Sequence, residues 1–89
     1  MAGVKLTKMT KEFEEFLTKV AAENKGTLTD MGSNWDLTAS PKLVLRRKTL
    51  DEFYKGRPMW ERNALWDSSP IFTEGTIAKL AEDECIIED

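Results

Sequence analysis

The densest group of side chains suited to binding lies in the middle of the 89-residue chain, between residues 42 and 66. This segment combines several arginines and lysines with one tyrosine and two tryptophans. Arginine, tyrosine and tryptophan are enriched at the hot spots of protein–protein interfaces, because each joins a large contact area to a polar end. The same residue types bind nucleic acid by neutralising phosphates and stacking on bases. The candidate binding residues are Arg46, Arg47, Lys48, Tyr54, Arg57, Trp60 and Arg62.

The distribution of charge along the chain decides which partner of this segment we favour. Residues 42–66 carry 7 basic and 3 acidic side chains, residues 67–89 carry 1 basic and 7 acidic ones, and the whole chain has a net charge of −3. An acidic chain is repelled from a polyanion at long range. Another protein is therefore our first hypothesis, and nucleic acid bound by residues 46–48 and the nearby aromatics is our second, with a homodimer left open. A third interpretation is that the basic middle and the acidic end face each other within the fold.

Common catalytic groups are missing from the sequence. The chain has no histidine, the side chain most used for proton transfer near neutral pH and the commonest metal ligand. Its single cysteine, Cys85, therefore cannot complete a zinc site or a Cys–His pair. The 5 glycines do not cluster as they do in phosphate-binding loops. The sequence predicts a protein that is not an enzyme and that uses no cofactor and no metal.

Carboxylates are the remaining groups that could exchange protons or bind a cation. Those near the C-terminus form a charged run, which is usually solvated, and without burial their pKa values stay ordinary. Asp30 and Asp36 flank a glycine but lack the alternating carboxylates of a calcium loop. We interpret the C-terminal acids as solvated surface, and a cation site at Asp30 and Asp36 would require ligands that converge on them from elsewhere in the fold.

Composition predicts one small intracellular domain. A chain of 89 residues with 40% hydrophobic and 33% charged residues falls within the range of single globular domains. One cysteine indicates a reducing compartment, so we expect a cytoplasmic protein, with neither a signal peptide nor a membrane span. Such chains are typical of inhibitors, adaptors and subunits, many of them encoded by viruses.

The elements that position these residues begin with an amphipathic helix. Thr10 is a plausible N-cap, acidic residues follow it, and Gly26 is a natural stop, which predicts a helix over residues 11–24. Apolar residues recur along it at helical spacing, and we expect their stripe to lie in the core. These residues are Phe13, Phe16, Leu17, Val20 and Ala21.

After Gly26 the apolar period changes to that of strands. Residues 27–31, 35–39 and 42–48 are short and rich in Thr, Leu, Val and Trp, and turn residues separate them. They predict an antiparallel meander of three strands, with the first helix on its apolar face.

Short helices are expected in the last part of the chain. A capping box at residues 49–52 predicts a helix to Tyr54, Pro58 opens a second helix to Trp66, and residues 73–82 have the spacing of a third. Residues 85–87 predict an edge strand. Trp60 and Trp66 are equally compatible with a place in the core of these helices and with a surface.

The predicted class is α+β: an N-terminal helix on a three-stranded antiparallel sheet, followed by two or three short helices in a single domain, 1–89. This order of elements resembles that of double-stranded RNA-binding modules, although the second helix opens with acidic residues where a phosphate-facing helix is basic. The expected core consists of Phe13, Phe16, Leu17, Val20, Trp35, Leu37, Leu43, Leu45, Ile77 and Leu80.

Overall fold

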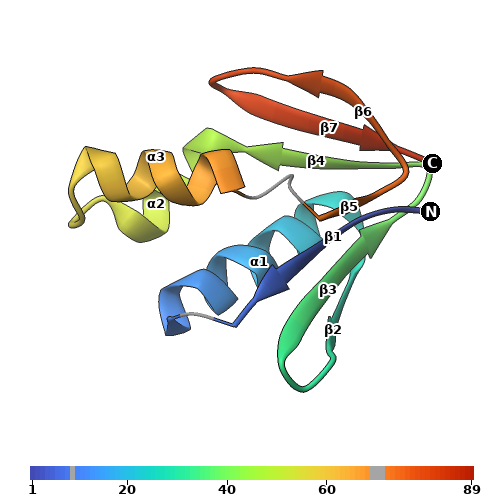
Figure 1. Cartoon of the computed structure of the whole chain (residues 1–89), viewed down its shortest axis with the longest axis horizontal. Helices are drawn as coiled ribbons and strands as arrows, with labels where there is room; N and C mark the ends of the chain where they lie inside the picture. Colours follow the sequence, from blue (N-terminus) through green and yellow to red (C-terminus); the bar gives the residue numbers. More distant parts are fainter. Residues whose placement is uncertain (9, 69–71) are drawn as a thin grey trace.

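A computed structural model describes residues 1–8, 10–68 and 72–89 of the chain (Figure 1). Within these residues it contains three helices and two antiparallel sheets, which confirms the α+β class. The first elements are β1 (Ala2–Thr7), α1 (Lys11–Asn24), β2 (Thr27–Asp30), β3 (Asn34–Ala39) and β4 (Lys42–Arg46). The remaining elements are α2 (Arg47–Tyr54), α3 (Met59–Ser68), β5 (Thr73–Glu74), β6 (Thr76–Leu80) and β7 (Glu84–Glu88). None of the described helices is long and apolar enough to cross a membrane.

The two sheets share one plan. The first sheet has the strand order β2-β3-β1-β5, and the second has the order β4-β7-β6. In each sheet a strand is followed by one or two helices and later by a hairpin whose last strand lies inside the sheet, and in the second unit the short strand β5, which pairs with β1 of the first sheet, precedes the hairpin. The sheets converge near the two chain ends, where the Met1 amino group lies 3.4 Å from Asp89 Oδ1 (Figure 1). The fold is therefore a pair of β-α-β-β units.

The predicted three-stranded meander is wrong in its third strand. β4 does not pair with β3 but with β7, with Lys42 opposite Glu88 and Arg46 opposite Glu84. The first sheet is completed instead by β1, a segment for which the sequence predicted no element, and Ala2 lies opposite Ala39. The element order that resembled double-stranded RNA-binding modules is consequently not the order of this fold.

The predicted C-terminal helix is also wrong, because this region forms β5 and β6. The predicted core residues Ile77 and Leu80 are 41% and 60% exposed. A bulge between Ile77 and Lys79 adds one residue to β6, so Ile77 and Leu80 lie opposite Ile87 and Cys85, which share one face of β7. A bulged strand thus reproduces the i, i+3 spacing of a helix. The predicted edge strand at 85–87 is the central strand, β7.

Helix α1 has the predicted bounds. Thr10 Oγ1 accepts a hydrogen bond from the Phe13 N–H at 3.3 Å. The helix ends at Lys25, which has the left-handed φ of 53°, and Gly26 follows it. A Cβ at Gly26 would lie 2.4 Å from the carbonyl oxygen of Thr38, so the close approach of β3 requires glycine there.

Helix α2 differs from its prediction because it begins at Arg47, directly after β4. Thr49 does not cap it. Thr49 occupies an internal position of α2 and its side chain is buried. Its hydroxyl donates a hydrogen bond to Glu23 Oε1 on α1 at 3.2 Å.

The core lies on the apolar face of α1, which contacts β2, β3, β4 and α2. Of the predicted core residues, Trp35 is only partly buried against this cluster. The predicted core residues that are buried are Phe13, Phe16, Leu17, Val20, Leu37, Leu43 and Leu45.

The side chain of Asn24 joins α1 to the outer edge of the second sheet. Its Oδ1 accepts a hydrogen bond from the Val44 N–H at 2.8 Å, and its Nδ2 donates to the Val44 carbonyl at 2.9 Å. β4 is an edge strand, so these two groups have no strand partner on that side. Asn24 therefore takes the place of a neighbouring strand at this position.

Replacing Asn24→Ala should lower the free energy of unfolding by about 1 to 3 kcal/mol, because both polar groups of Val44 lose their partner. Urea-induced unfolding would measure the loss, and hydrogen exchange at the Val44 amide should accelerate. Lys19→Ala, at an exposed position of the same helix, is the control and should change stability by less than about 0.5 kcal/mol. Equal stability of the two variants would contradict this role of Asn24.

Candidate functional site

The structure gathers the predicted binding residues at one end of the molecule. α2 and α3 lie side by side at the end opposite the chain termini (Figure 1). Arg46 ends β4, Arg57 lies between the two helices, and the other five residues belong to α2 or α3. The structure separates these seven residues into buried, ion-paired and exposed groups.

The prediction that Tyr54 belongs to the binding surface is wrong, because its side chain is only 1% exposed. It lies in the core, and its hydroxyl is 3.0 Å from the hydroxyl of Thr10. The two tryptophans of α3 also differ in burial. Trp60 is 72% exposed, whereas Trp66 is 4% exposed.

Two of the arginines share one carboxylate. Arg47 Nε donates to Asp51 Oδ1 at 3.1 Å, and Arg62 Nη1 lies 3.4 Å from the same oxygen. Arg47 Nη2 also donates to Asn63 Oδ1 at 2.7 Å. These contacts join α2 to α3, so the two guanidinium groups stabilise the helix pair and are less available to a ligand than the sequence suggested.

Arg57 has acidic partners of its own. Its Nη1 donates to Glu61 Oε1 at 3.0 Å, and its Nη2 lies 4.0 Å from Glu12 Oε1 on α1. Arg46 and Lys48, in contrast, are exposed and form no ion pair with any described residue. The exposed members of the predicted surface are therefore Arg46, Lys48 and Trp60, with Met59 beside Trp60 on α3.

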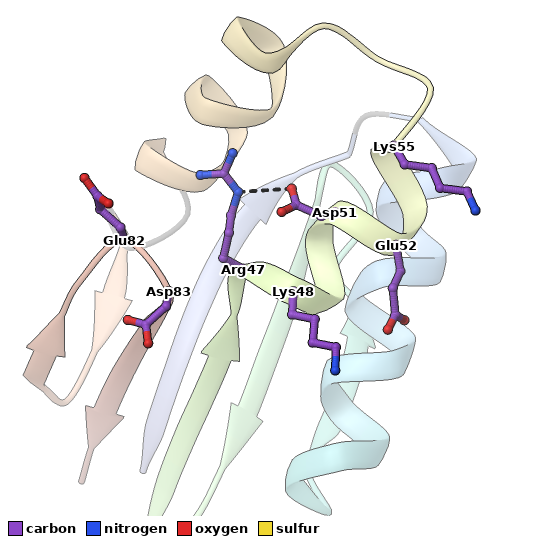
Figure 2. A pocket seen from close by; sticks show the side chains of 7 residues that line it. All are labelled: Arg47, Lys48, Asp51, Glu52, Lys55, Glu82 and Asp83. Carbon is purple, nitrogen blue, oxygen red and sulfur yellow. Dashed lines mark hydrogen bonds and ion pairs between the residues drawn. The ribbon is translucent and has the colours of Figure 1, made fainter.

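The basic middle and the acidic end of the chain meet beside α2. A hollow of about 550 Å³ there has side chains of both signs on its walls (Figure 2). Lys48 and Glu52 extend from α2 and Lys55 directly follows it, while Glu82 and Asp83 lie on the β6–β7 turn across from them. Among the described residues, no ion pair within 4.0 Å joins residues 42–66 to residues 67–89. The two charged segments are neighbours without close pairing.

A second and larger hollow, of about 850 Å³, lies between α3 and the β6–β7 turn, and we call it the α3 hollow. The sequence did not predict this hollow, because residues 73–82 were expected to form a helix with Leu80 in the core. The one feature of the sequence that could have pointed to an exposed apolar surface here was the apolar Met59 next to Trp60. The hollow is lined by Arg47, Asp51, Met59, Asn63, Trp66, Asp67, Leu80, Ala81 and Glu82.

Groups with catalytic or metal-binding potential have structural roles here. Cys85 is 1% exposed, and burial raises the pKa of its thiol, whereas a reactive cysteine needs a lowered pKa. Asp30 accepts hydrogen bonds from Lys8 and from the Gly32 N–H, and the bond from Lys8 is the main cause of its lowered pKa. In the described part of the chain, no group of three or more Cys, Asp and Glu side chains could hold a metal ion.

The titration of Tyr54 tests its placement. Burial raises the pKa of this phenol above its ordinary value of 10.0, so the unfolded chain loses the proton first. The stability that depends on the neutral phenol should therefore be fully present below about pH 10 and should be lost as the pH rises through the folded pKa. Tyr54 is the only tyrosine, so tyrosinate absorbance reports its pKa directly. A midpoint at the ordinary value in the folded protein would contradict its burial.

Comparisons with known proteins identify a shared fold. No protein-family model and no curated protein matches the sequence. Among solved structures, a chain of the phenol hydroxylase–regulatory protein complex matches with a TM-score of 0.68 and 18% sequence identity. The match covers 99% of this chain and 97% of that chain. At this identity the likeness shows the fold alone, and it extends over nearly the whole of both chains.

Proposed function

We propose that this chain is a small, non-catalytic regulatory protein that binds an oxygenase of the phenol hydroxylase type. The observation that carries the proposal is the likeness of fold to a chain of the phenol hydroxylase–regulatory protein complex, over 99% of this chain and 97% of that one. We take the matched chain as the regulatory member because it is about as small as this one.

The chemistry of the chain agrees with a role in binding. The sequence has no histidine for proton transfer, and the thiol of Cys85 is buried with a raised pKa. Three of the four arginines that could have bound an anionic substrate, Arg47, Arg57 and Arg62, are ion-paired with Asp51, Glu61 and Glu12. The α2–α3 end has exposed apolar and charged side chains around a helix pair. This combination is typical of surfaces that bind another protein.

Trp60 is the proposed anchor of this contact. Tryptophan is among the residue types most enriched at hot spots, and this one is 72% exposed in the free protein. Met59 extends the apolar area, while Arg46 at the end of β4 and Lys48 on α2 supply charge that has no acidic partner among the described residues. The proposed contact thus includes fewer residues than the basic and aromatic surface predicted from sequence.

Replacing Trp60→Ala should weaken binding to purified phenol hydroxylase by about 10- to 100-fold, mainly through faster dissociation. The free energy of unfolding should change by less than about 0.5 kcal/mol, because the side chain is mostly exposed. Biolayer interferometry and urea-induced unfolding would measure the two effects. Met31→Ala is the matched control, since Met31 is 57% exposed in the β2–β3 turn, away from α2 and α3, and its replacement should leave affinity unchanged.

Turnover tests the regulatory part of the proposal. The rate of phenol hydroxylation by an enzyme stripped of its own regulatory protein should change when this protein is added, and Trp60→Ala should require a correspondingly higher concentration for the same change. The absence of both binding and any change in rate would contradict the proposal. Binding to nucleic acid, with a steep dependence on salt, would support the second hypothesis instead.

A further inference from the structure

The α3 hollow has uncovered apolar side chains on two of its sides. Met59 on α3 is 57% exposed, and Leu80 at the end of β6 is 60% exposed. Trp66 lies between these two elements in the same lining and is almost fully buried. Apolar side chains that stay exposed around a concave surface are typical of a site that a ligand or partner covers.

Hydrogen bonds fix the shape of this hollow before any partner arrives. Trp66 Nε1–H donates to the Ala81 carbonyl at 3.2 Å, which holds α3 against the β6–β7 turn. The Ala81 N–H donates to the Glu84 carbonyl at 2.9 Å and closes that turn. The Arg47 N–H donates to the Asp83 carbonyl at 2.9 Å, which ties the turn to the start of α2. A partner therefore meets a preorganised surface, which lowers the entropic cost of binding.

The uncompensated charge of the α3 hollow is negative. Arg47 in its lining shares the Asp51 carboxylate with Arg62, at 3.1 and 3.4 Å, so these two guanidinium groups exceed their carboxylate by one charge, against the two negative charges of Asp67 and Glu82. Asp67 and Glu82 are exposed and have no ion pair with any described residue, and Figure 2 shows the Glu82 carboxylate turned away from the Arg47 guanidinium. The cation on β6, Lys79, is already bound to Glu84 at 2.8 Å. Two carboxylates thus line the same hollow as exposed apolar side chains, and no cation among the described residues is paired with them.

We infer that the α3 hollow receives an apolar segment of the partner protein that carries an arginine or lysine side chain. The apolar part of the segment would cover Met59 and Leu80, and its cation would lie between Asp67 and Glu82. This inference rests on the proposed function, and it adds the chemistry of the partner's contact segment. It also places the electrostatic contribution to binding on Asp67 and Glu82, in the hollow that Met59, the sequence neighbour of Trp60, helps to line.

The double variant Asp67→Asn, Glu82→Gln tests the inference, because it removes both charges and keeps the size of both side chains. Its affinity for phenol hydroxylase should fall by about 5- to 30-fold at low salt, and the difference from wild type should shrink at high salt, where charges are screened. The control is Glu15→Gln, Glu74→Gln, which changes the net charge equally at exposed positions on α1 and β5. The control should lose no more than about twofold.

A peptide probe tests the same chemistry without the enzyme. An apolar tetrapeptide with one arginine should shift the indole N–H resonance of Trp66, because this group is hydrogen-bonded to Ala81 at the hollow. The indole resonance of Trp35, on the first sheet, should not move. The same peptide with glutamine in place of arginine should bind more weakly, and so should the arginine peptide with the double variant.

The outcomes separate the inference from the proposed function. If the double variant loses no more affinity for phenol hydroxylase than its control, the inference is wrong, while a loss of binding on Trp60→Ala would still support the proposed function. If the arginine peptide moves Trp66 in wild type and not in the double variant, but phenol hydroxylase does not bind, the proposed function is wrong and the cation preference of the hollow stands.

Discussion

Burial of the apolar face of α1 is the constraint on which both sheets depend. One helix contacts β2 and β3 of the first sheet, β4 of the second sheet, and α2. Its residues Phe13, Phe16, Leu17 and Val20 are at most 2% exposed, so neither sheet can close its core without it. At the end of the same helix, Asn24 satisfies the Val44 N–H and carbonyl. Helix α1 therefore supplies both the apolar core and the polar edge that hold the two β-α-β-β units together.

The position of the candidate site follows from β4. Helix α2 begins at the residue after this strand, so the pairing of β4 with β7 sets where α2 emerges. The same pairing brings the β6–β7 turn to the start of α2, where the Arg47 N–H binds the Asp83 carbonyl. Trp66 then attaches α3 to that turn. The α3 hollow is thus formed by segments far apart in sequence that one strand pairing brings together.

Local signals in the sequence were sufficient for some elements and insufficient for others. Helix α1 was predicted to its exact bounds because its cap, its apolar period and its stop all lie within the same 17 residues, 10–26. The pairing of β4 with β7 joins residues about forty positions apart, which no local pattern encodes. Ile77 and Leu80 misled the prediction because a bulge gives a strand the same-face spacing of a helix. The predicted binding residues do lie together at one end of the molecule, but the burial of Tyr54 and the arginine pairs depend on contacts between elements, which no local pattern encodes.

Charge along the sequence is therefore a poor guide to charge on the surface of this protein. The basic middle segment was predicted to contact a partner, yet Arg47, Arg57 and Arg62 form ion pairs with Asp51, Glu61 and Glu12. These carboxylates lie on α2, α3 and α1, so none of the three arginines is ion-paired with the acidic end, while Arg46 and Lys48 form no ion pair with any described residue. Asp67 and Glu82 consequently keep an uncompensated negative charge beside exposed Leu80 and Met59. The arginines of α2 and α3 hold the two helices together, and the unpaired carboxylates of the α3 hollow are therefore the groups that our proposal assigns to partner selection.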